Sequence, residues 1–433
     1  MELVQSLSML ALHDLKALKL ARAWNTIGTA ARLEAARSCR GPVKAQGQEM
    51  SESSSRCYWS VHILESYFSP QYMLLNQHPF TPKYPRSAEC PPPLRTCYES
   101  ENTDIAQTPD VSDDGVNSSL LKIVSVWGGV VSYTQGIRWK KLEYPWEPMS
   151  RYNQLTQSVY EFEDGTAVKH LFRNTSLSER SPSEIAENLD YWRPWILMQM
   201  THHAASAVLN HPFIHMVALR VADRRAPPRL FLQSVIDQAL YHSKWVVRFI
   251  QICNDVGLDI RDPLIAQLVA ATATVLWLFK FAGDTNASAR AGEGFETCET
   301  YLRDASATWP HITGKSRQGG VAEGVTTTFR PSTFWKLLDP LILENIADDQ
   351  SGHDSNSRAS PMGDATLRIT THILHPVDEH TSTPTSATTN RPALTSTDED
   401  EERLCFNDLL SLYASSTDLS WLQPDNGFSA PLA

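Results

Sequence analysis

Apolar residues recur at helical spacing along most of the chain. Residues 3–20 and 21–38 both carry apolar side chains three or four positions apart, which predicts two packed antiparallel helices. Further segments with this spacing lie at 55–69 and at about 120–137, 150–162, 183–217, 229–256, 263–282, 293–308 and 331–347. Almost no segment alternates as a strand does, so the pattern predicts an all-α fold of packed helical hairpins.

The segment SRCYWSVHILESYFS, residues 55–69, raises the choice between a buried helix and a reactive site. A wide apolar face is expected from Tyr58, Trp59, Ile63, Leu64 and Tyr67. Arg56, Glu65 and Ser66 are expected to point away from that face. The pattern alone leaves this choice open.

Two stretches interrupt the helical pattern. Residues 70–119 are rich in Pro, Ser and Asp, which predicts a surface excursion that is partly disordered. After residue 347 the composition shifts to Ser, Thr, Asp, His and Pro, so 1–347 is expected to be the helical domain and 348–433 a largely disordered acidic tail. Within the tail, 398–428 mixes acids with large apolar residues, as in segments that fold onto a partner's groove.

Composition and charge narrow the classes of function. The chain has 433 residues, 42% of them apolar, and a net charge of −11, but residues 351–433 hold 12 acids and only 4 arginines. The body is thus nearly neutral and lacks the positive field of a stand-alone nucleic-acid binder. Glu2, His13 and Asp14 argue against a secretion signal, and the 16-residue uncharged run 264–279 is too short for a membrane span and predicts a buried helix.

The cysteine and histidine spacings do not predict a metal site. Of seven cysteines only Cys90 and Cys97 have the six-residue spacing of a zinc cluster half, and no Cys-x2-Cys pair exists, so free thiols are expected. His211 and His215 lie four residues apart, but Pro212 fits only a helix start. Helix caps and packed imidazoles are the favoured interpretation.

Catalytic motifs are also missing from the sequence. It contains no Gly-x-Ser-x-Gly elbow, P-loop or Gly-x-Gly-x-x-Gly, and the short basic clusters at 138–141, 220–225 and 315–317 are typical of solvated helix ends. An all-α enzyme of the terpene-cyclase type would need paired acidic metal motifs, which 348–354 and 254–259 match poorly. The chain is therefore expected not to be an enzyme, with this cyclase as the least favoured alternative.

Four segments in order resemble the regulatory middle region of fungal binuclear zinc-cluster transcription factors. They are ARAWNTIGTAARLEAA (21–36), SSSRCYWSVHILESYFS (53–69), HHAASAVLNHPFI (202–214) and IRDPLIAQLVAATATVL (260–276). Family members usually carry an Asp-Arg pair where Glu65 and Ser66 stand, so the acid is kept and the base is lost. The motif residues, which the resemblance implies are structural, are Trp24, Arg56, Trp59, Glu65, His211, Pro212 and Phe213.

The resemblance implies a nuclear regulator of RNA polymerase II transcription, acting on a metabolic pathway or a secondary-metabolite gene cluster. Zinc and promoter binding follow from the family alone, and are expected only if a zinc cluster is supplied upstream of Met1 or by a partner. No membrane contact is expected, and homo- or heterodimerisation stays open. A regulatory partner that has no DNA binding of its own and modulates a zinc-cluster factor is the alternative.

The acidic-apolar segment is the predicted contact for transcription coactivators. Its apolar side chains would enter a groove on the coactivator while the acids keep the segment soluble. The predicted contact residues are Phe406, Leu409, Leu410, Tyr413, Trp421 and Leu422. The alternative is that 403–422 packs on the body as a last helix.

Overall fold

The described part of the computed structural model is all-α, as predicted. It comprises residues 1–39, 51–70, 73–75, 81–94, 113–138, 143–215, 228–280, 285–313 and Leu338, and no strand occurs among them. The predicted helix at 331–347 (apart from Leu338), the tail at 348–433 and the segment 398–428 lie outside these residues.

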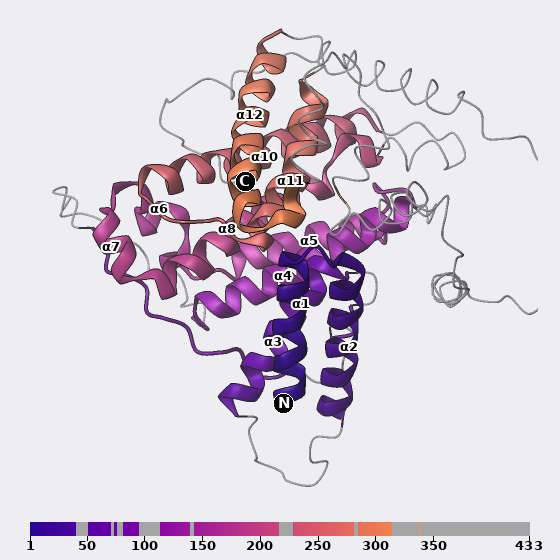
Figure 1. Ribbon diagram of the computed structural model, residues 1–433. Helices are drawn as coiled ribbons and strands as arrows, with labels where there is room; N and C mark the ends of the chain where they lie inside the picture. Colours follow the sequence, from indigo (N-terminus) through magenta and orange to yellow (C-terminus); the bar gives the residue numbers. More distant parts are fainter. Residues whose placement is uncertain are drawn as a thin grey trace, which may run out of the picture.

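An antiparallel pair of helices forms one end of the molecule (Figure 1). Helices α1 (Glu2–Lys16) and α2 (Leu20–Cys39) match the first two predicted helices, and α3 (Glu52–Phe68) packs beside them. Asp14 joins the pair: its buried carboxylate accepts hydrogen bonds from the Arg22 guanidinium, one of them 2.6 Å long. These hydrogen bonds lower the pKa of Asp14.

Helix α8 (Leu189–Leu209) runs through the centre of the fold. It packs against α4 (Val116–Arg138), α5 (Arg151–Asp164), α10 (Arg229–Asp255) and α11 (Pro263–Phe279), and every residue from Met198 to Leu209 is buried. In α4, Gly128 allows close approach to α3, because a Cβ there would lie 2.6 Å from Met73 Cε and 3.2 Å from Ser66 Cβ. The core is continuous from α1 to α12.

The predicted helix at 183–217 is divided in the structure. A capping box of Ser181 and Glu184 starts α7 (Pro182–Glu187), Asn188 separates it from α8, and a new helix begins at Pro212. The segment before α7 contains short elements that periodicity did not predict. They are η1 (Val168–His170), α6 (Phe172–Thr175) and η2 (Leu177–Glu179).

Helices α11 and α12 (Thr285–Thr308) form the opposite end of the molecule, with α10 beside them (Figure 1). The side chain of Asp262 caps α11, and Pro263 occupies its first turn. Helix α11 is buried almost throughout, which confirms the prediction of a core helix for 264–279. In the described part of the chain, every helix is too short or too polar to cross a bilayer. After α12, η3 (Pro310–Ile312) returns to contact α1.

In the stretch expected to be a surface excursion, residues 81–94 have no helix or strand and are held to the body by hydrogen bonds. Residues 81–94 lie along α3 and α8: Lys83 O accepts a 3.2 Å hydrogen bond from Trp59 Nε1, and Pro92 O accepts one of 2.7 Å from Arg180 Nη2. Residues 73–75 are fixed by Glu65 at the end of α3. Backbone carbonyls that proline-rich sequence cannot pair internally are thus satisfied by side chains of the body.

Candidate functional site

The family-motif residues of α2 and α3 make structural contacts. Trp24 is half-buried and packs against the core. Trp59 is 5% exposed and stacks on Tyr84, with ring centroids 5.0 Å apart. Arg56 is exposed and forms an ion pair with Glu52 at 2.9 Å. Trp24 and Trp59 thus make packing contacts, and Arg56 makes a surface ion pair.

Glu65 corrects the prediction that the acid of this helix points away from the core. Its carboxylate is 2% exposed and accepts hydrogen bonds from the N–H groups of Leu74 at 2.8 Å and Leu75 at 3.1 Å. Burial raises the pKa of Glu65, while the two N–H donors oppose that shift. Ser66 is buried as well. The acid therefore fixes a turn, because 73–75 folds back onto the end of α3.

The motif around His211 is a helix start. His211 Nδ1 accepts a 3.2 Å hydrogen bond from the N–H of Phe213, and Pro212 begins the helix. His215 Nε2 lies 3.0 Å from Leu209 O, and both imidazoles are fully buried. Burial lowers the pKa of His211 to about 3 and that of His215 to about 4. In the structure His211 caps the helix that begins at Pro212, and the imidazole of His215 packs in the core.

A cluster of three histidines lies where α5, α8 and α10 meet. His203 Nδ1 is 2.9 Å from His242 Nδ1, so one of the two nitrogens carries the hydrogen between them. His202 Nε2 lies 2.8 Å from Glu163 Oε1, and the His203 ring stacks on Trp245. Burial lowers the pKa of His203 and of His242 well below the usual value. The neutral imidazoles of His203 and His242, packed in this way, support the core.

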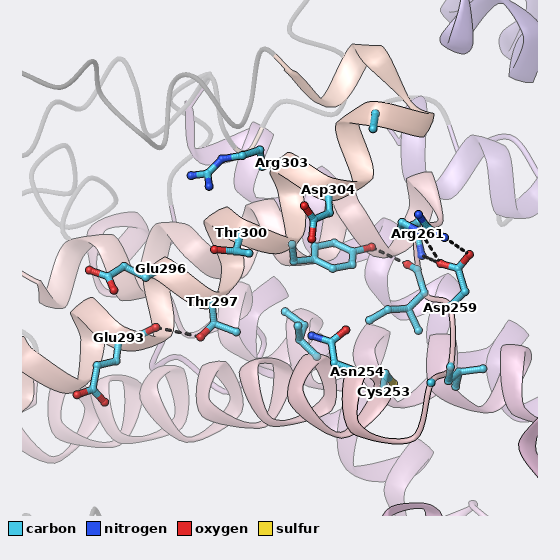
Figure 2. A pocket seen from close by; sticks show the side chains of 16 residues that line it. Cys253, Asn254, Asp259, Arg261, Glu293, Glu296, Thr297, Thr300, Arg303 and Asp304 are labelled. Carbon is cyan, nitrogen blue, oxygen red and sulfur yellow. Dashed lines mark hydrogen bonds and ion pairs between the residues drawn. The ribbon is translucent and has the colours of Figure 1, made fainter. Parts of the chain in front are cut away.

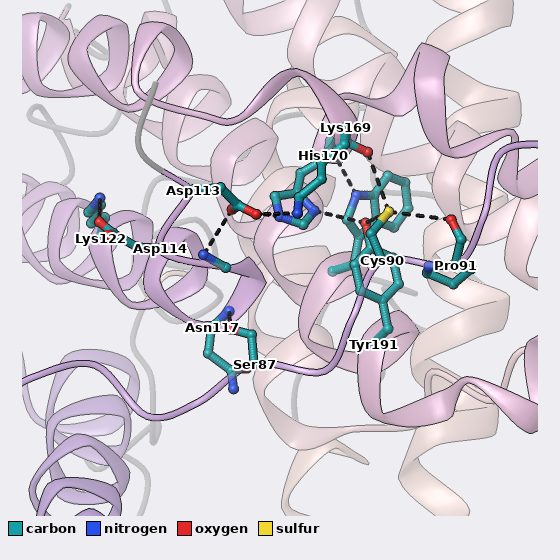
Figure 3. A network of polar contacts seen from close by, with 12 residues as sticks. Ser87, Cys90, Pro91, Asp113, Asp114, Asn117, Lys122, Lys169, His170 and Tyr191 are labelled. Carbon is teal, nitrogen blue, oxygen red and sulfur yellow. Dashed lines mark hydrogen bonds and ion pairs between the residues drawn. The ribbon is translucent and has the colours of Figure 1, made fainter. Parts of the chain in front are cut away.

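A chain of polar contacts joins four separated segments beside α8 (Figure 3). Cys90 Sγ donates to Tyr191 Oη at 3.3 Å, Tyr191 Oη lies 3.0 Å from His170 Nδ1, and His170 Nε2 lies 3.2 Å from Asp113 Oδ1. Asp113 also binds Lys169 and accepts a 2.9 Å hydrogen bond from the N–H of Gly115.

This network resembles a proton relay that ends in a thiol, but its geometry favours a structural role. His170 and Tyr191 are each 1% exposed, so a substrate has no access to the imidazole. Burial lowers the pKa of His170 and raises that of Tyr191. His170 O also accepts a 2.8 Å hydrogen bond from Trp195 Nε1. The network fixes residues 90 and 113–115 against α8.

A groove of about 830 Å³ opens between the end of α10, the turn after it and α12 (Figure 2). Its rim carries the acids Asp259, Glu293, Glu296 and Asp304 and the bases Arg261 and Arg303. Arg261 donates to both carboxylate oxygens of Asp259 at 2.8 and 2.9 Å, which lowers the pKa of Asp259 to about 2.

The floor of the groove is chemically quiet. Tyr301 donates a 2.7 Å hydrogen bond to Ile260 O, and burial raises the pKa of the Cys253 thiol to about 12. The thiol is protonated, and the Tyr301 hydroxyl already donates its hydrogen to a backbone carbonyl. Neither group offers a nucleophile or a general base at neutral pH. The mixed charges of the rim suit a polar surface contact better than a reaction.

The described residues do not fit a zinc cluster. Cys57, Cys90, Cys253 and Cys298 are free thiols on separate elements, and no three of the described His, Cys, Asp or Glu side chains are placed to share a metal ion. The predicted coactivator contacts Phe406, Leu409, Leu410, Tyr413, Trp421 and Leu422 lie outside the described residues. Neither the groove nor the network was predicted, since their members lie far apart in sequence.

Comparison with known proteins finds one distant relative among curated sequences. The chain is 23% identical over 203 residues to an uncharacterized transcriptional regulatory protein of Schizosaccharomyces pombe. The match covers 46% of this chain and 24% of the relative, so the chain spans a minor part of that protein. No family model and no solved structure matches the chain.

Proposed function

We propose that this chain is the helical regulatory part of a nuclear regulator of RNA polymerase II transcription. The observation that carries the proposal is the 203-residue match to the transcriptional regulatory protein of Schizosaccharomyces pombe. The all-α body, with motif residues in packing and capping roles, supports a regulatory rather than a catalytic domain. Its targets are proposed to be the genes of one metabolic or secondary-metabolite pathway.

Promoter recognition is proposed to come from a zinc cluster of the fungal binuclear type, carried upstream or by a partner. The cysteines of this chain lack that spacing. The segment 398–428 is proposed to recruit coactivators through the six apolar residues named above, with its acids giving solubility and steering.

The test is a reporter assay with the full chain fused to an unrelated DNA-binding domain. The triple variant Phe406→Ala, Leu410→Ala, Trp421→Ala is expected to lose most of the activation, since each change removes a large apolar contact. Asn407→Ala with Ser411→Ala is the matched control and should keep it. Full activation by the triple variant would overturn the coactivator role.

A second arm separates the alternative, a partner that does not bind DNA itself. The unfused chain is expressed with a promoter reporter, in cells with and without a full-length zinc-cluster factor. Activity only in the presence of that factor supports the partner model. Reporter output that never changes in either arm contradicts a role in transcription.

A further inference from the structure

The outer face of α1 is unusually apolar for a solvated helix surface. Leu3, Met9 and Leu10 are 61%, 68% and 41% exposed. Leu3 and Leu10, two turns apart, share one side of the helix, and Met9 lies about 100° further round, away from the buried stripe. Exposed leucines also flank this helix, at position 18 after its end and at position 33 on α2. Six of the eleven large apolar residues that are exposed in the described chain belong to residues 1–39. A concentration of this kind marks an interaction surface.

The same face becomes basic toward the end of α1. His13, Lys16, Lys19 and Arg22 are exposed, whereas the nearby acid Asp14 is buried and bound to Arg22. Glu2, at the other end of the helix, is the only exposed acid of residues 1–39. The α1 face, defined by Leu3, Met9, Leu10, His13 and Lys16, thus runs from apolar to positive.

The backbone is strained at Leu18, just after the end of α1. Leu18 adopts φ 60°, the left-handed region, where a branched side chain costs about 1–2 kcal/mol. It is also 57% exposed, so the cost is not offset by burial in the core. An exposed apolar residue held in a strained turn points to a contact made outside the described fold.

The sequence of this chain contains a complementary segment. Residues 398–402 are all acidic, and after them Phe406, Leu409, Leu410 and Tyr413 follow at helical spacing. Residues 339–397 separate Leu338 from this segment, enough chain to reach any part of the body. If this segment docked as a helix antiparallel to α1, its acids would lie beside the bases and its apolar stripe would lie on Leu10, Met9 and Leu3.

We propose that residues 403–413 dock on the α1 face of the same chain, antiparallel to α1. Docking uses the same apolar residues that the proposed function assigns to coactivator binding, and it rests on that function in this respect alone. The α1 face and the coactivator therefore compete for these residues. A second copy of the chain or another acidic partner are the other occupants that the test distinguishes.

The test is thiol cross-linking within the full chain, which needs no transcription readout. Cys405 lies in the docking segment, and Met9→Cys supplies a partner thiol on α1. A short bismaleimide is expected to join the two within one chain about tenfold faster than it joins Cys405 to Tyr160→Cys, an exposed control on α5, because docking raises the effective concentration. Cys405→Ser should abolish the product.

Two further variants sharpen the result. Phe406→Ser with Leu410→Ser in the Met9→Cys chain should reduce the rate to that of the Tyr160 control. Leu3→Cys should react more slowly than Met9→Cys, since antiparallel docking places Cys405 nearer the end of α1. Equal rates at positions 9 and 160, or products joining two chains, would overturn the proposal. A chain with unchanged 403–422 that cross-links as expected but does not activate the reporter would count only against the coactivator role.

Discussion

Helices α8 and α1 differ in which side chains they bury: α8 buries polar ones, and α1 exposes apolar ones. In α8 even the histidines are buried, and each finds a contact within the fold. In α1 only a narrow stripe is buried, and apolar side chains such as Met9 lie in solvent. The polar residues of α8 are therefore parts of the fold, whereas the apolar residues of α1 are available for a contact. Substitutions should separate these two roles.

The largest loss of stability is expected from Trp195→Ala in α8. The side chain is fully buried and its Nε1 donates to His170 O at 2.8 Å. Removing it leaves a cavity, and His170 O keeps only its 3.3 Å hydrogen bond from Gln199 Nε2, for a cost of about 3–5 kcal/mol in the free energy of unfolding. Denaturant titration measures the loss. Tyr160→Ala, at an exposed position, should stay within about 0.5 kcal/mol.

A smaller loss is expected from Glu65→Ala. Two buried N–H groups, those of Leu74 and Leu75, would lose their acceptor, at a cost of about 2–3 kcal/mol. Arg56→Ala on the same helix removes only an exposed ion pair and should cost less than about 1 kcal/mol. Equal unfolding midpoints for the two variants would contradict the role of Glu65 as a turn anchor.

Acid should weaken the α8 region through its histidines. Burial lowers the pKa of His203 and His242, so the folded state keeps them neutral while the unfolded chain takes up protons below about pH 6.5. Stability present at pH 7 is then lost as the pH falls, by up to about 1.4 kcal/mol per pH unit for each histidine.

The variant His203→Gln checks this linkage. Its unfolding free energy, measured from pH 7 to pH 5, should fall less steeply than that of the unchanged chain. The difference in slope should be at most that of one proton, about 1.4 kcal/mol per pH unit. Leu33→Asn on α2 changes no titratable group and should leave the slope as it is. If all three proteins have the same slope, His203 takes up its proton equally in the folded and the unfolded chain, which contradicts the prediction.

The smallest effect, and the only gain, is expected at the end of α1. Leu18→Asn relieves a left-handed leucine and should raise the free energy of unfolding by about 0.5–1 kcal/mol, because asparagine tolerates this region better. Leu33→Asn on α2 changes exposed surface without such strain and should give no gain. A loss of stability in Leu18→Asn would mean that the leucine packs more than its exposure suggests.

The sequence predicted the helices well, because each buries a face that periodicity reveals. It predicted less where contacts cross between distant segments. The burial of Glu65 depends on a turn at 73–75, and the contact of Cys90 with Tyr191 spans about a hundred residues. Helix α12 begins at Thr285, eight residues before the predicted start at 293, and the prediction missed its first two turns because they show little apolar periodicity. Contacts between residues that are far apart in the sequence produce no local pattern from which they could be predicted.

The candidate sites show the same division. Pro212 fits only a helix start, and a helix does begin there, although the periodicity had predicted one helix over 183–217. The groove beside α12 was not predicted, because charged residues at 259–261 and 293–304 resemble any solvated surface until the fold brings them together.

The anchoring of residues 73–75 and 81–94 has a consequence for the integrity of the chain. Glu65 binds the first stretch, and Trp59 and Arg180 bind the second, so both are attached to the body independently of the peptide bonds between them. A chain cleaved between residues 75 and 81 should therefore remain one particle, and its two fragments should elute together until denaturant separates them.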